Sequence, residues 1–253
     1  MNLNDCFNFN DFRKLAKKKL PAPILHYIDG GSDDEVTLNR NTNAFNDCDL
    51  VPNILASVGE PDLSTTVFGK KIDMPLFLSP CAMQSLYTPE GDKASARAAE
   101  KHGTMYSMST MASFSIEEVA EISNCPKLFQ LYVHKDQSIT DDLIDRCRAA
   151  NFNGLCLTVD TLVAGNRERD HRTGFTTPPK LTLESLLSFA MRPEWVFKYL
   201  TNKKFELANI KNKTDKGTNI AKSVIDYINE QYDQAMNWKD EEYGIKTWNG
   251  PFA

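Results

Sequence analysis

The sequence lacks the features that mark membrane-spanning, secreted or nucleic-acid-binding proteins. No apolar run approaches the roughly 20 residues that a membrane helix requires. The first residues show no basic start followed by an apolar stretch, so no secretory signal is visible. Basic residues form no long run, and the formal net charge is -5, which argues against nucleic acid as the main partner. These absences favour a cytoplasmic location.

The cysteines and histidines also lack the spacing that is typical of a metal site. The sequence has 6 cysteines, and no two of them form a C-x-x-C pair, so we expect neither a zinc site nor a disulfide framework. Its 4 histidines include no i, i+4 pair, so no metal is predicted. We expect free thiols in a reducing compartment, several of them in the core.

What the chain contains is ordinary for a soluble globular protein, with 41% hydrophobic and 25% charged residues. In residues 1–73 we expect a helix from Phe12 to Leu20 and a shorter one that ends at Gly30-Gly31. Ser32 and Glu35 have the spacing of a capping box, which predicts that a further helix begins at this serine. A loop or edge hairpin is expected from Gly59 to Gly69.

From residue 74 onward, strand and helix patterns alternate. The expected strands are Pro75–Ser79, Thr104–Ser109, Leu128–Val133 and Leu155–Val159, and the expected helices between them are Asp92–Lys101, Ile116–Ile122 and Ile139–Ala150. The strands recur about every 25 residues, which is the size of a βα unit in a parallel sheet. This predicts an α/β fold, either a (β/α)8 barrel or a doubly wound sheet. No G-x-G-x-x-G follows any strand, which argues against a doubly wound sheet of the dinucleotide-binding kind.

The alternation stops after Asp160. Residues 161–222 are rich in Thr, Pro, Asn and Lys, and within them Leu181–Leu200 is amphipathic and aromatic. That stretch could dock on a membrane surface, but packing against the barrel is the favoured interpretation. A helix is expected from Ser223 to about Gln234, and the last residues, Asn249–Ala253, resemble the approach to another strand.

Polar side chains follow each expected strand. These strand ends are Ser79–Gln84, Ser107–Thr110, Phe129–Tyr132 and Thr158–Asp160. In a parallel barrel the active site lies at the carboxyl ends of the strands, and hydroxyl, amide and phenol groups there suit a flat heterocycle or a small polar substrate. Asp160 closes an apolar run, GLCLTVD. We expect it to be buried and to need a partner, because a buried carboxylate without one is costly.

Five stretches of the sequence resemble the FMN-dependent α-hydroxy acid dehydrogenase/oxidase family. They are Leu20-Pro21 with Tyr27, Pro80–Gln84, Phe129–Val133, Leu157–Thr161 and Asn237–Asp240. The resemblance runs from near the amino terminus to the last residue. The segment between Thr161 and Trp238, with Arg192-Pro193-Glu194-Trp195, is more similar to bacterial L-lactate dehydrogenases than to plant-type glycolate oxidases.

The resemblance implies a (β/α)8 TIM barrel of which residues 1–253 would be a single, incomplete domain. Residues 1–73 would be an amino-terminal helical segment, 74–160 would carry the first four strands, and 161–240 would be a long insert. The family's next-strand lysine, catalytic histidine, second substrate arginine and phosphate site would lie beyond the matched region. None of the 4 histidines matches the catalytic position, and His134 is the nearest local candidate.

The resemblance implies FMN as the cofactor and a role for each matched residue. Ser109, Gln130 and Thr158 would hydrogen-bond the flavin, and the backbone of Pro80, Cys81 and Ala82 would lie along its ring. The phenols of Tyr27 and Tyr132 would contact the hydroxy acid, and Arg167 would bind its carboxylate. Asp160 would orient the catalytic histidine that these residues do not contain.

Structural alternatives remain for these residues. Tyr27 could simply cover a core with its ring, and Gln130 and Thr158 could satisfy strand ends. Arg167 lies in a charged cluster that is typical of a solvated loop. Ser107 and Thr110 compete with Ser109, because strand phase is not fixed by the sequence.

The implied reaction is oxidation of a small L-2-hydroxy acid to the 2-oxo acid, with L-lactate as first choice and glycolate as the alternative. The electron acceptor would be a quinone, a cytochrome or oxygen. A second hypothesis is a non-catalytic, accessory half-barrel that pairs with another chain. We expect residues 1–253 alone to be inactive and to hold FMN weakly, and the complete protein to be a homo-oligomer, cytoplasmic or peripheral on the inner face of the plasma membrane.

Overall fold

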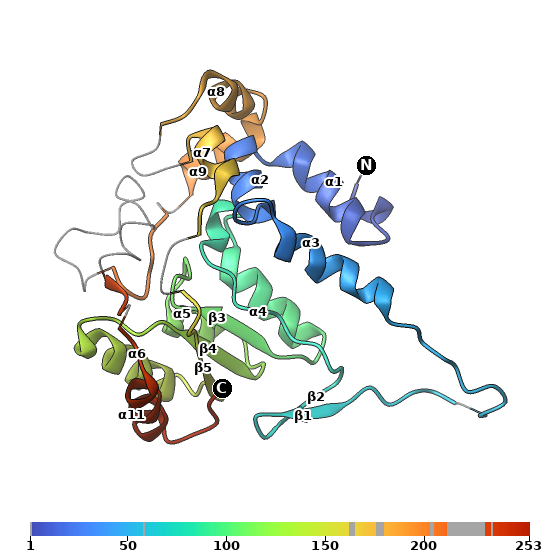
Figure 1. Ribbon diagram of the computed structural model, residues 1–253, viewed down its shortest axis with the longest axis vertical. Coiled ribbons are helices and arrows are strands. Elements are labelled where there is room, and N and C mark those ends of the chain that lie inside the picture. Colours follow the sequence, from blue (N-terminus) through green and yellow to red (C-terminus); the bar gives the residue numbers. More distant parts are fainter. Residues whose placement is uncertain are drawn as a thin grey trace. The chain divides into compact units, whose positions relative to one another are not determined.

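The computed structural model describes residues 2–57, 59–161, 165–175, 180–202, 205–211, 231–233 and 235–253. The chain divides into two compact units. The helical unit comprises Met1–Asp62 and Gly165–Thr201, and the sheet unit comprises Leu63–Ala164 and Asn202–Ala253. Figure 1 shows the elements of both units.

The sheet unit is built on a parallel sheet whose strands lie in chain order, β3-β4-β5. They are β3 (Tyr106–Ser109), β4 (Lys127–Leu131) and β5 (Gly154–Leu157). Parallel bridges extend this order at both edges, from Leu78 to Tyr106 and from Leu155 to Phe252. Neighbouring strands that follow one another along the chain are the arrangement of a barrel wall. Within the described residues the sheet is open, so this part of the chain is a partial α/β barrel.

Helices alternate with these strands as the sequence predicts. They are α4 (Gly91–Lys101), α5 (Ile116–Ile122) and α6 (Gln137–Ala149), preceded by the 3-10 turn η3 (Gln84–Leu86). The capping box at Ser115 is confirmed, because the Glu118 N–H donates to its hydroxyl at 3.1 Å and its own N–H donates to the Glu118 carboxylate at 2.9 Å. The predicted apolar face of α6 is buried at Ile139, Leu143, Ile144 and Cys147.

The core of the sheet unit lies between the sheet and these helices. Every residue of β3 and β4 is buried, and Phe129 meets Phe152 edge-on with ring centroids 6.1 Å apart. An antiparallel hairpin, β1 (Thr65–Val67) with β2 (Lys70–Ile72), precedes the sheet, and Ile72 joins the core. Phe68 and Gly69 form its turn with φ of 50° and 73°, a conformation that glycine adopts without strain.

For this unit one predicted strand needs correction and one helix was not predicted. The strand expected at Pro75–Ser79 is reduced to the single bridge at Leu78, and Pro75 lacks the N–H that a longer ladder would use. The helix α11 (Trp238–Trp248) was missed, although Asn237 and Asp240 form a capping box at its start. The expected approach to another strand is confirmed by the bridge at Phe252. The helix expected from Ser223 to about Gln234 lies almost entirely outside the described residues.

The helical unit contains η1 (Leu3–Asp5), α1 (Phe9–Lys19), α2 (Ala22–Asp29), α3 (Val36–Asn43), η2 (Ala44–Asp47), α7 (Glu168–Thr173), α8 (Leu183–Ala190) and α9 (Pro193–Thr201). The capping box expected at Ser32 and Glu35 is wrong. Helix α3 begins one residue after Glu35, and that carboxylate accepts from the Gly31 N–H at 3.0 Å and pairs with Arg169. The Glu35 carboxylate thus pairs with a distant arginine and does not form the expected capping-box hydrogen bond with Ser32.

Candidate functional site

A hydrogen-bonded row of polar side chains crosses the ends of the three parallel strands. The Ser109 hydroxyl donates to the Gln130 amide oxygen at 3.1 Å, and the Gln130 amide nitrogen donates to the Thr158 hydroxyl at 2.7 Å. Ser109 and Gln130 are 3% and 5% exposed. Since β3, β4 and β5 are adjacent and parallel, the same register that pairs Ser109 with Gln130 in the ladder also aligns their side chains.

The structure distinguishes Ser109 from its two neighbours. The Thr110 hydroxyl donates to the backbone carbonyl of Gln130 at 2.7 Å, which makes it part of the sheet's backbone bonding. Ser107 is buried, and its hydroxyl has no partner among the described residues. Among these three residues, only Ser109 places its hydroxyl on the Gln130 side chain.

The segment that follows Leu78 lies at the surface of the sheet unit. Pro80 and Cys81 are exposed and Ala82 is half-buried. The Gln84 amide nitrogen lies 3.4 Å from the Cys81 carbonyl oxygen and 3.2 Å from the Asp92 carboxylate, so the segment is tied to a buried group beneath it.

That buried group is a carboxylate that the sequence did not single out. Asp92 is 0% exposed and accepts hydrogen bonds from the Tyr106 hydroxyl at 3.0 Å and from the Ser113 N–H at 3.0 Å, in addition to Gln84. Burial raises the pKa of Asp92 to about 6, although these hydrogen bonds favour the charged form. Its position at the start of α4, after a glycine, was the only sequence signal for such a group.

Asp160 is exposed, which corrects the expectation of a buried carboxylate at this position. Strand β5 ends at Leu157, and Val159 is already 62% exposed, so the chain leaves the core before it reaches the aspartate. The nearby Tyr132 is half-buried, and burial followed by the negative charge of Asp160 raises the pKa of its phenol. The phenol therefore keeps its proton at neutral pH.

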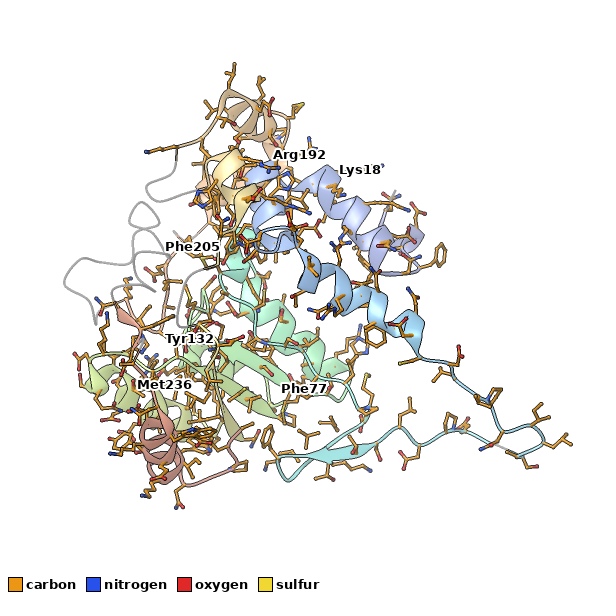
Figure 2. The ribbon with its side chains drawn as sticks, in the orientation of Figure 1. Lys18, Phe77, Tyr132, Arg192, Phe205 and Met236 are labelled. Carbon is orange, nitrogen blue, oxygen red and sulfur yellow. The ribbon has the colours of Figure 1, made fainter. Side chains whose placement is uncertain are left out.

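Tyr132 is also held by a segment distant in the sequence. Its ring stacks on that of Tyr232 with centroids 4.5 Å apart, and Tyr232 meets the ring of His134 edge-on at 5.2 Å (Figure 2 labels Tyr132). His134 is 1% exposed, and burial lowers the pKa of its imidazole to about 4. The imidazole is neutral at physiological pH and packed inside the unit. No pattern in the sequence predicts the contact with Tyr232.

Tyr27 and Arg167 lie together in the helical unit. The Arg167 guanidinium carbon is 5.0 Å from the centroid of the Tyr27 ring, and the same group donates to the Tyr27 carbonyl oxygen. Its Nε donates to the Asp170 carboxylate at 2.8 Å, and its side chain is 31% exposed. The ring of Phe175 packs against the ring of Tyr27, with their centroids 5.4 Å apart. Arg167 therefore has fixed partners, unlike the residues of a solvated loop.

The expected site residues thus form two groups. The strand-end row, the segment Pro80–Ala82, Tyr132 and Asp160 belong to the sheet unit, and Tyr27 and Arg167 belong to the helical unit. Within the sheet unit the donor set fits a flavin. The Gln130 amide and the Ser109 and Thr158 hydroxyls offer both donors and acceptors for a polar heterocyclic edge, and the segment Pro80–Ala82 is accessible to a flat ring.

Comparison with known proteins places the chain in a family. A family model described as FMN-dependent dehydrogenase matches residues 16–253. The chain is 36% identical over 242 residues to an L-lactate dehydrogenase of Allorhizobium ampelinum, covering 95% of this chain and 63% of the relative. It is 38% identical over 233 residues to glycolate oxidase of Spinacia oleracea, covering 92% and 57%.

Solved structures agree with this placement. A monotopic membrane protein, (S)-mandelate dehydrogenase, superposes with a TM-score of 0.90 at 29% identity, over 98% of this chain and 65% of that one. A lactate oxidase of Pediococcus acidilactici gives a TM-score of 0.76 at 29% identity, over 98% and 59%. The chain spans between 57% and 65% of the length of these four relatives. With 238 consecutive residues matched, the chain belongs to the family of FMN-dependent dehydrogenases.

Proposed function

We propose that this protein oxidises a small L-2-hydroxy acid to the 2-oxo acid with FMN as its cofactor. L-lactate is the first candidate substrate and glycolate the second. The observation that carries the proposal is the row of Ser109, Gln130 and Thr158, hydrogen-bonded across the ends of three adjacent strands. Membership of the FMN-dependent dehydrogenase family supports it.

The proposed binding of FMN assigns the polar row to the polar edge of the flavin. Bound FMN would supply a ring that accepts hydride from the substrate carbon. Gln130 would hold its amide toward that edge because Ser109 and Thr158 fix both ends of the amide. The backbone of Pro80, Cys81 and Ala82 would lie along the ring, and Gln84 would keep this segment in place through the Cys81 carbonyl.

We propose that Tyr27, Tyr132 and Arg167 are substrate-binding residues, as the family resemblance implies. The planar guanidinium of Arg167 offers parallel N–H donors that suit a carboxylate. The protonated phenol of Tyr132 can donate to a substrate oxygen. Asp160 would orient and stabilise a histidine that takes the hydroxyl proton. Its exposed position leaves its oxygens accessible to such a partner.

The remaining proposals concern the whole protein. It would form a complete (β/α)8 barrel and a homo-oligomer, and it would pass electrons to a quinone, a cytochrome or oxygen. It would act in the cytoplasm or peripherally on the inner face of the plasma membrane. One solved relative is a monotopic membrane protein, which supports the second location.

The flavin assignment is tested by changing Gln130→Leu in the purified protein. Loss of the hydrogen bonds to a buried polar edge should weaken FMN binding by about 1–3 kcal/mol, or roughly 5- to 150-fold. The bound flavin is measured by its absorbance after gel filtration. Gln137→Leu is the matched control, because this glutamine is exposed on α6. Equal flavin content in the two variants would refute the role of Gln130.

The substrate assignment is tested by Arg167→Lys with steady-state kinetics on L-lactate and glycolate. The ammonium of lysine cannot reproduce the parallel N–H donors of a guanidinium. The kcat/KM should therefore fall by about ten- to a hundred-fold through loss of a charge-assisted hydrogen bond. Arg172→Lys is the control, since that side chain is 75% exposed on α7, the helix that begins just after Arg167. If Arg167→Lys retains the parent kcat/KM, the arginine serves only the structure of the helical unit.

A further inference from the structure

A buried hydrogen-bond network is linked to the segment Pro80–Ala82. At its centre is the carboxylate of Asp92, which is 0% exposed. Its Oδ1 accepts from the Gln84 amide nitrogen at 3.2 Å and from the Tyr106 hydroxyl at 3.0 Å. Its Oδ2 accepts from the Ser113 N–H at 3.0 Å. These neutral donors come from η3, from β3 and from the loop before α5, so the carboxylate joins three parts of the sheet unit.

The side-chain amide of Gln84 is held in one orientation by this network. Its oxygen accepts from the Ser95 hydroxyl at 2.6 Å, and its nitrogen donates to Asp92 and to the Cys81 carbonyl oxygen. If the amide were turned over, its oxygen would face the Asp92 carboxylate and the Cys81 carbonyl, which are both acceptors. The carboxylate therefore determines which end of the amide faces the Cys81 carbonyl.

The contact with Cys81 fixes a peptide group in the segment along which the flavin is proposed to lie. A trans peptide is planar, so its C=O and its N–H point in opposite directions. Because the Cys81 carbonyl is turned toward Gln84, the N–H of Ala82 in the same peptide is turned away from Gln84. The orientation of this peptide depends on Gln84 and, through Gln84, on Asp92.

Within this network the charge of Asp92 changes near neutral pH. Burial raises the pKa of Asp92 to about 6. The titratable side chains that interact with it are Tyr106 of β3 and Cys81. Burial and the negative charge of Asp92 raise the pKa of both, so both stay protonated between pH 5 and 7. Lys93, the next residue of α4, is paired with Glu118 at 3.4 Å.

We propose that Asp92 is a positioning residue for the flavin and that its negative charge is needed for this role. The charged carboxylate holds the Gln84 nitrogen toward the Cys81 carbonyl, and the peptide keeps the orientation that receives the ring. A proton on Oδ1 would face two donors, Gln84 and Tyr106, and would release the amide. FMN should therefore bind more tightly when Asp92 is charged. The inference rests on the proposed binding of FMN along Pro80–Ala82.

The test is the dissociation constant of FMN, measured by flavin fluorescence as the purified, flavin-free protein is titrated with FMN at several pH values. At pH 7 the parent should bind FMN about five- to tenfold more tightly than Asp92→Asn, which lacks the charge at every pH. This ratio should shrink toward one as the pH falls to 5. Because the phosphate of FMN titrates equally in both experiments, the ratio reports on Asp92 alone.

Two further variants separate the charge from the packing. Tyr106→Phe keeps the buried ring and removes a hydrogen bond that lowers the pKa of Asp92. The pKa should then rise, and the pH at which FMN affinity falls should move upward. Gln84→Leu leaves the carboxylate in place but interrupts its link to Cys81. It should bind FMN about five- to tenfold more weakly than the parent at pH 7 and should lose the dependence on Asp92.

Matched controls change similar groups elsewhere in the sheet unit. Tyr243→Phe removes a hydroxyl that donates to the exposed Asp141 at 3.0 Å. Asp145→Asn removes a carboxylate whose side chain is 69% exposed, and Gln137→Leu removes an exposed amide. All three should bind FMN as the parent does, with the same pH dependence. Circular dichroism verifies that each variant is folded.

The proposal is overturned if the ratio of FMN affinities between the parent and Asp92→Asn is the same at pH 5 and pH 7. An unshifted pH dependence in Tyr106→Phe would also overturn it. If Gln130→Leu weakens FMN binding while Asp92→Asn and Gln84→Leu do not, the flavin site stands and this inference fails. If the parent itself does not bind FMN, the proposed function fails together with the inference.

Discussion

The two units differ in the size of their apolar core and in the contacts that hold their helices. In the sheet unit apolar side chains fill the interior, with Phe129, Leu143 and Leu155 all 0% exposed, and polar groups gather at the strand ends. In the helical unit the buried apolar residues include Leu15, Leu20 and Ile24, and polar contacts add to their packing. Arg169 pairs with Glu35 and lies 3.8 Å from Asp29, and Ser188 accepts from the Ala22 N–H.

The difference shows where each unit obtains its stability and where it can bind other molecules. Burial of apolar area is non-directional and tolerates small shifts, whereas hydrogen bonds and ion pairs depend on single partners. In the sheet unit the polar row stands on close-packed strands and is hydrogen-bonded along its length, so it is held in a fixed position. In the helical unit, α8 makes polar contacts on its inner side and leaves its leucines at the surface.

The largest expected effect is that of Phe129→Ala. This ring is 0% exposed and meets Phe152, so its removal leaves a cavity that should lower the free energy of unfolding by about 3–5 kcal/mol. Urea denaturation, with hydrogen exchange resolved by peptide, measures the loss in the sheet unit. Phe45→Ala removes a ring that is 79% exposed and should change stability little. Equal effects of the two changes would contradict the comparison.

The next effect is a pH dependence that comes from Asp92. Its pKa is raised from 3.8 to about 6, mainly by burial, so between pH 4 and 6 the folded protein binds the proton more tightly than the unfolded chain. The free energy of unfolding should fall as pH rises through that window, by about 3 kcal/mol in total. Asp92→Asn should abolish this contribution, which is obtained as the difference between parent and variant stabilities at each pH.

The difference measurement is needed because His134 acts in the opposite direction. Burial lowers its pKa from 6.5 to about 4, so the unfolded chain binds the proton more tightly in the same window and stability rises with pH. The control is Asp145→Asn, whose side chain is 69% exposed. If the difference in the free energy of unfolding between the parent and Asp92→Asn does not change between pH 4 and 6, the Asp92 carboxylate is not desolvated.

A smaller effect is expected from Ser188→Ala in the helical unit. The change leaves the Ala22 N–H without its acceptor, so the free energy of unfolding should fall by about 1–3 kcal/mol. Hydrogen exchange of residues 22–29 should accelerate, with no change in the sheet unit. Ser138→Ala removes an exposed hydroxyl that bonds Asp136 and serves as the control. Unchanged protection of residues 22–29 would mean that this polar contact does not hold α8.

The smallest effect is expected from Leu187→Gln. The side chain is 55% exposed on α8, so the free energy of unfolding should change by no more than about 0.5 kcal/mol. Leu143→Gln, at a position that is 0% exposed on α6, should be strongly destabilising. Thermal melts of the two variants give the comparison directly. A large destabilisation by Leu187→Gln would place that leucine in a core.

The sequence by itself determined the elements whose signals are local. Helices α4, α5 and α6 were predicted to within two residues, and the capping box at Ser115 was correct, because apolar periodicity and caps depend only on near neighbours. It also showed that polar residues follow the strands, and family membership is confirmed by the match over residues 16–253. The roles given to those residues remain predictions.

Tertiary structure decided what depends on partners distant along the chain. It joined Ser109, Gln130 and Thr158 into one row, buried Asp92, exposed Asp160 and turned the leucines of α8 outward. The physical reason is that strand register and helix rotation are set by contacts across the fold, and a change in either moves a side chain from one face to the other. A local pattern shows that a helix has two faces, and only the packed chain decides which of them is buried.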